Sequence, residues 1–231
     1  MTEHTPLVEI NDLAIKFGAH TAVNNVTMDI GRGRIMGLVG ESGSGKSTIA
    51  NAIIGLLPHA AQISNGSLRF DGRDLLSFTA QDWGKIRGKD IAYVSQDPMS
   101  ALNPVLRIGE QMLDIQHLSD QSNTEKLANA LAALEQVRMP QAQARLSMYP
   151  HELSGGQKQR VCIAMVIMAR PKLLITDEAT TALDATLEVE IVRLLKELQT
   201  DIGCTMLFVT HHLTVVEELC DDVTVMYQGD I

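Results

Sequence analysis

A glycine-rich loop that fits the pattern G-x-x-x-x-G-K-S/T is the strongest chemical signal in the sequence. Its nine residues are Gly40, Glu41, Ser42, Gly43, Ser44, Gly45, Lys46, Ser47 and Thr48. Glycines let such a loop aim successive backbone N–H groups at an anion, and the helix that follows adds its positive N-terminal end. We expect Lys46 to reach the β- and γ-phosphates of ATP and the Ser47 hydroxyl to bind Mg²⁺.

Two adjacent acids, Asp177 and Glu178, end an apolar segment that begins at Leu173. Adjacent side chains of a strand point to opposite faces, so both acids serve one site only if the chain turns where the strand ends. Open α/β sheets bind ligands at this carboxyl edge. We expect Asp177 to hold Mg²⁺ through water and Glu178 to polarise an attacking water. The alternative is an acidic strand end that faces solvent.

A third motif, L-S-G-G-Q, begins at Leu153 and contains Ser154, Gly155, Gly156 and Gln157. Ser154 and Gln157 have the spacing of a capping box, which predicts the start of a helix there. A capping box does not require the two glycines. They leave the start of the helix bare, so that an anion can approach closely.

The elements that must position these motifs follow from the hydrophobic pattern. Short apolar runs alternate with helix-like stretches, which predicts an α/β fold with a mainly parallel sheet. Predicted strands of this sheet are 35–39, 173–175, 206–209 and 223–227, and predicted helices are 47–57, 187–198 and 215–219. A further short strand is expected at 66–72.

Two regions depart from this alternation. Short apolar runs at 7–10, 14–17 and 26–30 predict an antiparallel β layer ahead of the phosphate loop. Residues 97–157 are helical in pattern, with a capping box at Ser122 and Glu125, and we interpret them as an inserted subdomain. We therefore expect one P-loop NTPase domain over 1–231, with a RecA-like core and antiparallel layer in 1–96 and 158–231.

Composition limits the class of protein. The chain has 231 residues, 45% hydrophobic and 20% charged, and a formal net charge of −9, which argues against a nucleic-acid partner. Its longest uninterrupted apolar run, Val161 to Ala169, is far shorter than the roughly 20 residues that span a bilayer. The expectation from composition is a globular, cytosolic protein without a membrane segment of its own.

The order of phosphate loop, L-S-G-G-Q and acidic strand resembles the nucleotide-binding subunit of an ABC transporter over nearly the whole chain. The resemblance implies a head-to-tail dimer in which Ser154, Gly155, Gly156 and Gln157 of one subunit close on ATP held by the other. It also implies peripheral attachment to the cytoplasmic face of the inner membrane. The implied partners are a second ATPase subunit, identical or paralogous, two transmembrane permease subunits and, indirectly, an external solute-binding protein.

Four further residues have roles implied by the resemblance alone. Gln96 matches the glutamine that senses Mg²⁺ and the attacking water, and Asp184 matches a loop that crosses the dimer interface. His211 matches the switch histidine at the γ-phosphate, and Phe17 the aromatic that stacks on adenine. Each residue also has a purely structural alternative. Gln96 would be a polar strand boundary and Asp184 a helix N-cap. His211 would be a turn histidine and Phe17 a core phenylalanine.

The stretches 95–104 and 149–152 resemble the ATPases of peptide and nickel importers. They predict uptake of a peptide, nickel or a metal chelate, with export less favoured. Ala179 and His212 depart from the family, where Pro and Asp are common. The rival classes are a soluble ABC-type ATPase without a membrane partner and a regulatory module that binds but does not hydrolyse ATP.

Overall fold

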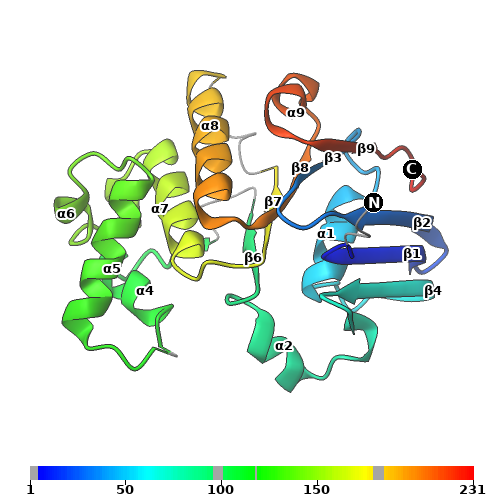
Figure 1. Ribbon diagram of the computed structural model, residues 1–231, viewed down its shortest axis with the longest axis horizontal. Helices are drawn as coiled ribbons and strands as arrows, with labels where there is room; N and C mark the ends of the chain where they lie inside the picture. Colours follow the sequence, from blue (N-terminus) through cyan, green and yellow to red (C-terminus); the bar gives the residue numbers. More distant parts are fainter. Residues whose placement is uncertain (1–4, 96–100, 118, 179–184) are drawn as a thin grey trace. The chain divides into compact units, whose positions relative to one another are not determined.

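The computed structural model describes residues 5–95, 101–117, 119–178 and 185–231, apart from the side chains of residues 185 and 186. The chain divides into two compact units, which are described separately (Figure 1). The first contains residues 1–93, 172–178 and 203–231, and the second contains 94–171 and 179–202.

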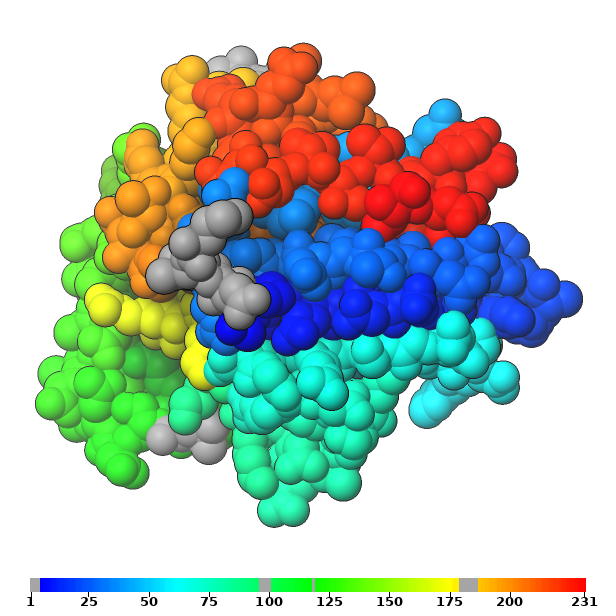
Figure 2. All heavy atoms as spheres, turned by 45° about the vertical axis from the view of Figure 1, so that its right-hand side comes forward, coloured from blue at the N-terminus to red at the C-terminus, as the bar shows by residue number. Residues whose placement is uncertain are grey.

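A four-stranded antiparallel sheet opens the first unit, with the order β2-β1-β4-β5. Its strands are β1 (Val8–Phe17), β2 (His20–Ile30), β4 (Ala61–Phe70) and β5 (Arg73–Asp74). Figure 2 shows β1 and β2, in shades of blue, running across one face beside the cyan residues of β4. The predicted antiparallel layer is therefore confirmed.

One difference from the prediction is that the runs 7–10 and 14–17 belong to a single strand. The polar residues between them are accommodated by a register shift between Ile10 and Leu13 and by a positive φ of 48° at Asp12. The Asp12 N–H donates to the Thr27 hydroxyl at 2.9 Å, which replaces a regular ladder bond. A polar interruption in the sequence thus marks a bulge and does not end the strand.

The second sheet of the unit has the order β6-β7-β8-β3-β9. Its strands are β3 (Ile35–Val39), β6 (Ile91–Val94), β7 (Leu173–Asp177), β8 (Thr205–Thr210) and β9 (Asp222–Val225). β3 runs parallel to β8 and β9, and β7 runs parallel to β8. Val39 pairs with Thr210 and Asp177 with Val209, so the phosphate loop, the acidic pair and His211 lie at one carboxyl edge of the sheet.

The helices of the first unit are α1 (Lys46–Ile54), η1 (Leu75–Ser77), α2 (Ala80–Ile86) and α9 (Leu213–Leu219). α1 was expected to extend to Leu57, but it ends at Ile54, and Gly55 adopts the left-handed conformation of a helix C-cap. α2 was not predicted, although Thr79 and Asp82 form a capping box at its start. Buried aliphatic side chains from both sheets and α1 form the core of this unit.

The second unit is helical. It contains α4 (Ile108–Asp114), α5 (Asn123–Gln136), α6 (Ala142–Arg145), η2 (Pro150–Glu152), α7 (Gly155–Ile167) and α8 (Ala185–Ile202). The predicted capping box at the start of α5 is present, with Ser122 and Glu125 exchanging hydrogen bonds. α7 and α8 group with the other helices, whereas the division drawn from the sequence resumes the core at residue 158. The guanidinium of Arg160 on α7 lies 2.9 Å from the carboxylate of Glu190 on α8 and links the two helices.

Candidate functional site

The phosphate loop connects β3 to α1 at the carboxyl edge of the parallel sheet. Glycine is required at two of its positions because of close backbone approach. A Cβ at Gly40 would lie 2.0 Å from the Met226 carbonyl oxygen, and one at Gly45, whose φ is 109°, would lie 2.4 Å from the Ala22 carbonyl oxygen. Gly40 and Gly45 are therefore required by close packing, independently of any ligand. Loops with this curvature can also bind an anion through their N–H groups.

Lys46 is the first residue of α1 and is only 3% exposed. Its Nζ donates to the carbonyl oxygens of Gly40 at 2.9 Å and Glu41 at 2.8 Å. Burial lowers the pKa of Lys46, while the nearby charges of Glu178 and Asp177 raise it. An ammonium group held inside the loop, close to two acids, is placed to accept a new anionic partner.

Asp177 ends β7 and is 7% exposed. The Ser47 hydroxyl donates to its Oδ1 at 2.9 Å, and the Tyr93 hydroxyl donates to its Oδ2 at 2.8 Å. The structure thus joins the two residues that the sequence assigned to Mg²⁺. Tyr93 was not predicted from the sequence. The signal that could have found it is a hydroxyl-bearing side chain in the otherwise apolar strand β6, where the hydroxyl of a half-buried tyrosine usually finds a hydrogen-bond partner.

Glu178 follows directly, with a φ of 48° in the left-handed region. Its backbone N–H donates to the Val209 carbonyl oxygen at 3.0 Å, so it stays attached to β8 while the chain turns. This confirms the condition set by the sequence, that the chain must turn where the strand ends. Asp177 bonds to Ser47 and Tyr93, whereas Glu178 Oε1 lies 3.3 Å from Nδ1 of His211.

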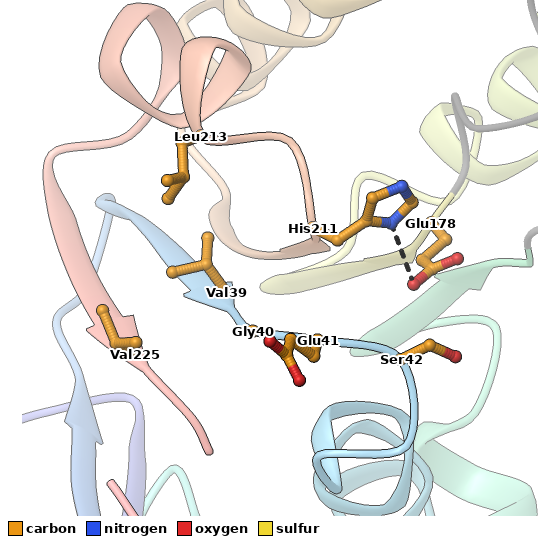
Figure 3. A pocket seen from close by; sticks show the side chains of 8 residues that line it. All are labelled: Val39, Gly40, Glu41, Ser42, Glu178, His211, Leu213 and Val225. Carbon is orange, nitrogen blue, oxygen red and sulfur yellow. Dashed lines mark hydrogen bonds and ion pairs between the residues drawn. The ribbon is translucent and has the colours of Figure 1, made fainter.

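A cavity of about 590 Å³ opens beside this pair and is shown in Figure 3. Its polar side comprises the Glu178–His211 pair and the start of the phosphate loop. The labelled apolar side chains of Val39, Leu213 and Val225 form the other side. The His212 ring packs edge-on against that of His211, with centroids 4.3 Å apart and planes inclined by 77°. The sequence did not predict the apolar side of this cavity.

The L-S-G-G-Q motif lies in the second unit, at the start of α7. The Ser154 N–H donates to Gln157 Oε1 at 3.1 Å, and the Gln157 N–H donates to the Ser154 hydroxyl at 3.4 Å, so the predicted capping box is confirmed. A Cβ at Gly156 would lie 3.2 Å from Leu187 Cδ1, whereas a Cβ at Gly155 would have no neighbour within 4 Å. Packing against Leu187 therefore favours glycine at position 156, whereas Gly155 leaves the first turn of α7 open.

The remaining residues singled out in the sequence fall into two groups. Phe17 ends β1, and its half-buried side chain packs against the core of the first unit with part of the residue still exposed. Gln96, Ala179 and Asp184 lie outside the described residues.

The donor atoms at Asp177 fit a magnesium ion. A carboxylate and a hydroxyl within hydrogen-bond distance are the hard oxygen ligands that Mg²⁺ prefers. Within the described part of the chain, no three His, Cys, Asp or Glu side chains gather into a metal cage. Mg²⁺ is usually held by one or two protein oxygens together with water and substrate phosphates.

Comparison with known proteins supplies the family. Residues 23–181 match the family model described as ABC transporter. The chain belongs to the ABC transporter family. Within this family it is an ABC ATPase cassette, and the family's activity is ATP hydrolysis coupled to transport.

The ABC cassette is similar to several curated proteins. It is 44% identical to the oligopeptide transport ATP-binding protein OppD of Salmonella typhimurium, over 96% of this chain and 68% of OppD. It is 39% identical to the dipeptide transport ATP-binding protein DppD of Lactococcus lactis, over 97% of this chain and 66% of DppD. The chain thus spans about two thirds of the length of these relatives.

Solved structures agree with the fold. A dimeric ATP-binding cassette in a post-hydrolysis state, bound to ADP and Pi, superposes with a TM-score of 0.84 at 28% identity and covers 97% of this chain and 96% of that one. CbiO1 from Clostridium perfringens, part of an ABC transporter complex, gives 0.85 at 29% identity, with 97% and 86% covered. The predicted P-loop NTPase fold with an antiparallel sheet, a parallel sheet and helices is confirmed. None of the helices described is long and apolar enough to cross a bilayer.

Proposed function

We propose that this chain is the ATP-binding subunit of an ABC importer and that it hydrolyses ATP at a dimer interface to drive uptake of peptides. The observation that carries the proposal is the divergence of two adjacent acids at a left-handed turn. Asp177 accepts a hydrogen bond from the Ser47 hydroxyl, and Glu178 lies within hydrogen-bond distance of His211. Asp177 thereby contacts Ser47, the proposed magnesium ligand that follows the phosphate-loop lysine, and Glu178 faces His211 beside the cavity.

The roles proposed for these residues follow from their chemistry. The N–H groups of Gly40 to Thr48 hold the phosphates, and Lys46 neutralises the charge that develops on them. Asp177 and Ser47 hold Mg²⁺, which when bound offsets phosphate charge. Glu178 orients the attacking water, and His211 fixes the carboxylate of Glu178 and contacts the γ-phosphate.

The contributions proposed in trans rest on the family. Ser154, Gly155, Gly156 and Gln157 of one subunit close on the ATP bound by the other, and the bare first turn of α7 offers N–H groups to an anion. Gln96 completes the metal and water shell, Asp184 crosses the interface, and Phe17 stacks on adenine. The dimeric solved relative supports a paired arrangement of cassettes.

The proposed partners and location follow from the relatives. OppD and DppD are named as peptide transport ATP-binding proteins, which supports peptide cargo over the nickel and metal-chelate alternatives. The same names favour a transporter subunit over a soluble ATPase without a membrane partner. We place the chain peripherally on the cytoplasmic face of the membrane, bound to two permease subunits and a second ATPase subunit, with an external binding protein delivering the solute.

The test compares the wild-type chain with Glu178→Gln. We expect the variant to bind ATP as tightly as the wild type but to release phosphate at a rate reduced by at least 10²-fold, because only the group that orients water is lost. Calorimetry measures binding, and a phosphate-release assay measures turnover. Near wild-type turnover by the variant would refute the role of Glu178, and absence of turnover by the wild type with its permease would refute the function.

A further inference from the structure

Tyr93 contacts the site through its hydroxyl, and neither the motifs nor the family comparison assigns it a task. It lies in β6, a strand otherwise made of Ile91, Ala92 and Val94. Its ring packs against the core of the first unit, while its hydroxyl donates to Asp177 Oδ2 at 2.8 Å. The Tyr93 side chain thus joins the core of the unit to the carboxylate that ends β7.

The two hydrogen bonds on Asp177 approach from different sides of the carboxylate. Ser47 donates to Oδ1 and Tyr93 donates to Oδ2. A carboxylate with one donor can still rotate about its terminal torsion, which is broad and roughly two-fold. A second donor on the other oxygen fixes the plane of the group, so that Oδ1 is the oxygen presented to Ser47 and the phosphate loop.

The Tyr93 hydroxyl is a dependable donor. A tyrosine hydroxyl ordinarily titrates at about pH 10, so the proton stays on it at physiological pH. A protonated phenol and an ionised carboxylate form a charge-assisted hydrogen bond, which is shorter and stronger than a neutral one.

We propose that Tyr93 is a positioning residue that orients the Asp177 carboxylate for the metal ion that accompanies ATP. The inference rests on the proposed function, since it presumes that Asp177 holds Mg²⁺. Partners that orient a metal ligand from outside the coordination shell typically contribute 10–100-fold to metal affinity. Tyr93 is expected to act at the lower end of that range, because Ser47 still holds the other oxygen in its absence.

The decisive variant is Tyr93→Phe in the full chain, because phenylalanine keeps the ring that packs on the core and removes only the hydroxyl. The probe is Mn²⁺ with a non-hydrolysable ATP analogue, and bound Mn²⁺ is measured by electron paramagnetic resonance. We expect the Mn²⁺ dissociation constant to rise by about tenfold, whereas affinity for the analogue in the absence of metal stays unchanged. Tyr149→Phe, which removes a hydroxyl in the second unit, is the matched control and should bind Mn²⁺ as the wild type does.

A second readout separates orientation of the ligand from loss of structure. The Mg²⁺ concentration for half-maximal phosphate release should rise in Tyr93→Phe, and excess Mg²⁺ should restore the wild-type rate. A rate lowered equally at every Mg²⁺ concentration would assign Tyr93 to packing alone and overturn the inference. Equal Mn²⁺ affinity in variant and wild type would also overturn it while leaving the proposed function intact. A wild-type chain that binds the analogue without any effect of Mn²⁺ would refute the metal role of Asp177 itself.

Discussion

Lys46 shows at the scale of one residue how the chain prepares for a ligand. Its ammonium group is almost fully buried and is bound by two carbonyl oxygens of its own loop. Carbonyl dipoles compensate a buried cation less completely than an anion does, and burial lowers the pKa of Lys46 accordingly. Phosphate oxygens at this position would supply full countercharge to a group that has already lost its water.

We therefore predict that Lys46→Ala weakens ATP binding by roughly 10–100-fold, the equivalent of a lost hydrogen bond to a charged group. Isothermal calorimetry measures the change directly. Lys85→Ala is the control, because Lys85 lies on α2 with a side chain that is 64% exposed and pairs only loosely with Asp82. An affinity that Lys46→Ala leaves unaltered would remove Lys46 from the phosphate site.

At the scale of elements, three segments distant in sequence are held together by one carboxylate. Asp71, which follows β4, accepts from Arg32 in the turn between β2 and β3 and from Lys172 just before β7. These two hydrogen bonds lower the pKa of Asp71 to about 2. A carboxyl whose pKa is depressed in the folded state stabilises the fold above its unfolded pKa of about 4, and the effect disappears as the pH falls through 2.

We expect Asp71→Asn to lower the free energy of unfolding by about 1 kcal/mol at pH 7, since both partner side chains are nearly half exposed and water screens them. Urea denaturation at several pH values measures the difference, which should narrow as the pH falls below about 4. Asp201→Asn, at the exposed end of α8, is the control. A difference that stays constant down to acidic pH would show that the asparagine acts through packing and not through charge.

The order of the elements and the edge at which the motifs meet could be predicted, because each rests on a local pattern. The apolar strand 35–39, the glycine loop and the strand that ends in two acids all lie where the sequence indicates. The contacts of Tyr93 with Asp177 and of Asp71 with Lys172 could not be predicted, since they join residues 84 and 101 positions apart. The continuity of β1 could not be predicted either, because Asn11 and Asp12 interrupt its apolar pattern. In the structure the strand continues past them through a bulge.

At the scale of the whole molecule, we propose that each chain carries half of each ATP site. The phosphate loop, Asp177, Glu178 and His211 belong to the first unit and the L-S-G-G-Q motif belongs to the second. The proposed complete site pairs the first unit of one subunit with the second unit of another. Hydrolysis must then depend on association, which mass action links to protein concentration.

Phosphate release per chain, recorded over a wide dilution series at saturating ATP and Mg²⁺, tests whether the complete ATP site forms only between two subunits. We predict a rate per chain that rises with protein concentration and approaches a plateau, and a rate near zero for Glu178→Gln throughout the series. A rate per chain that stays constant at every dilution would contradict this prediction, because each chain would then carry a complete site of its own.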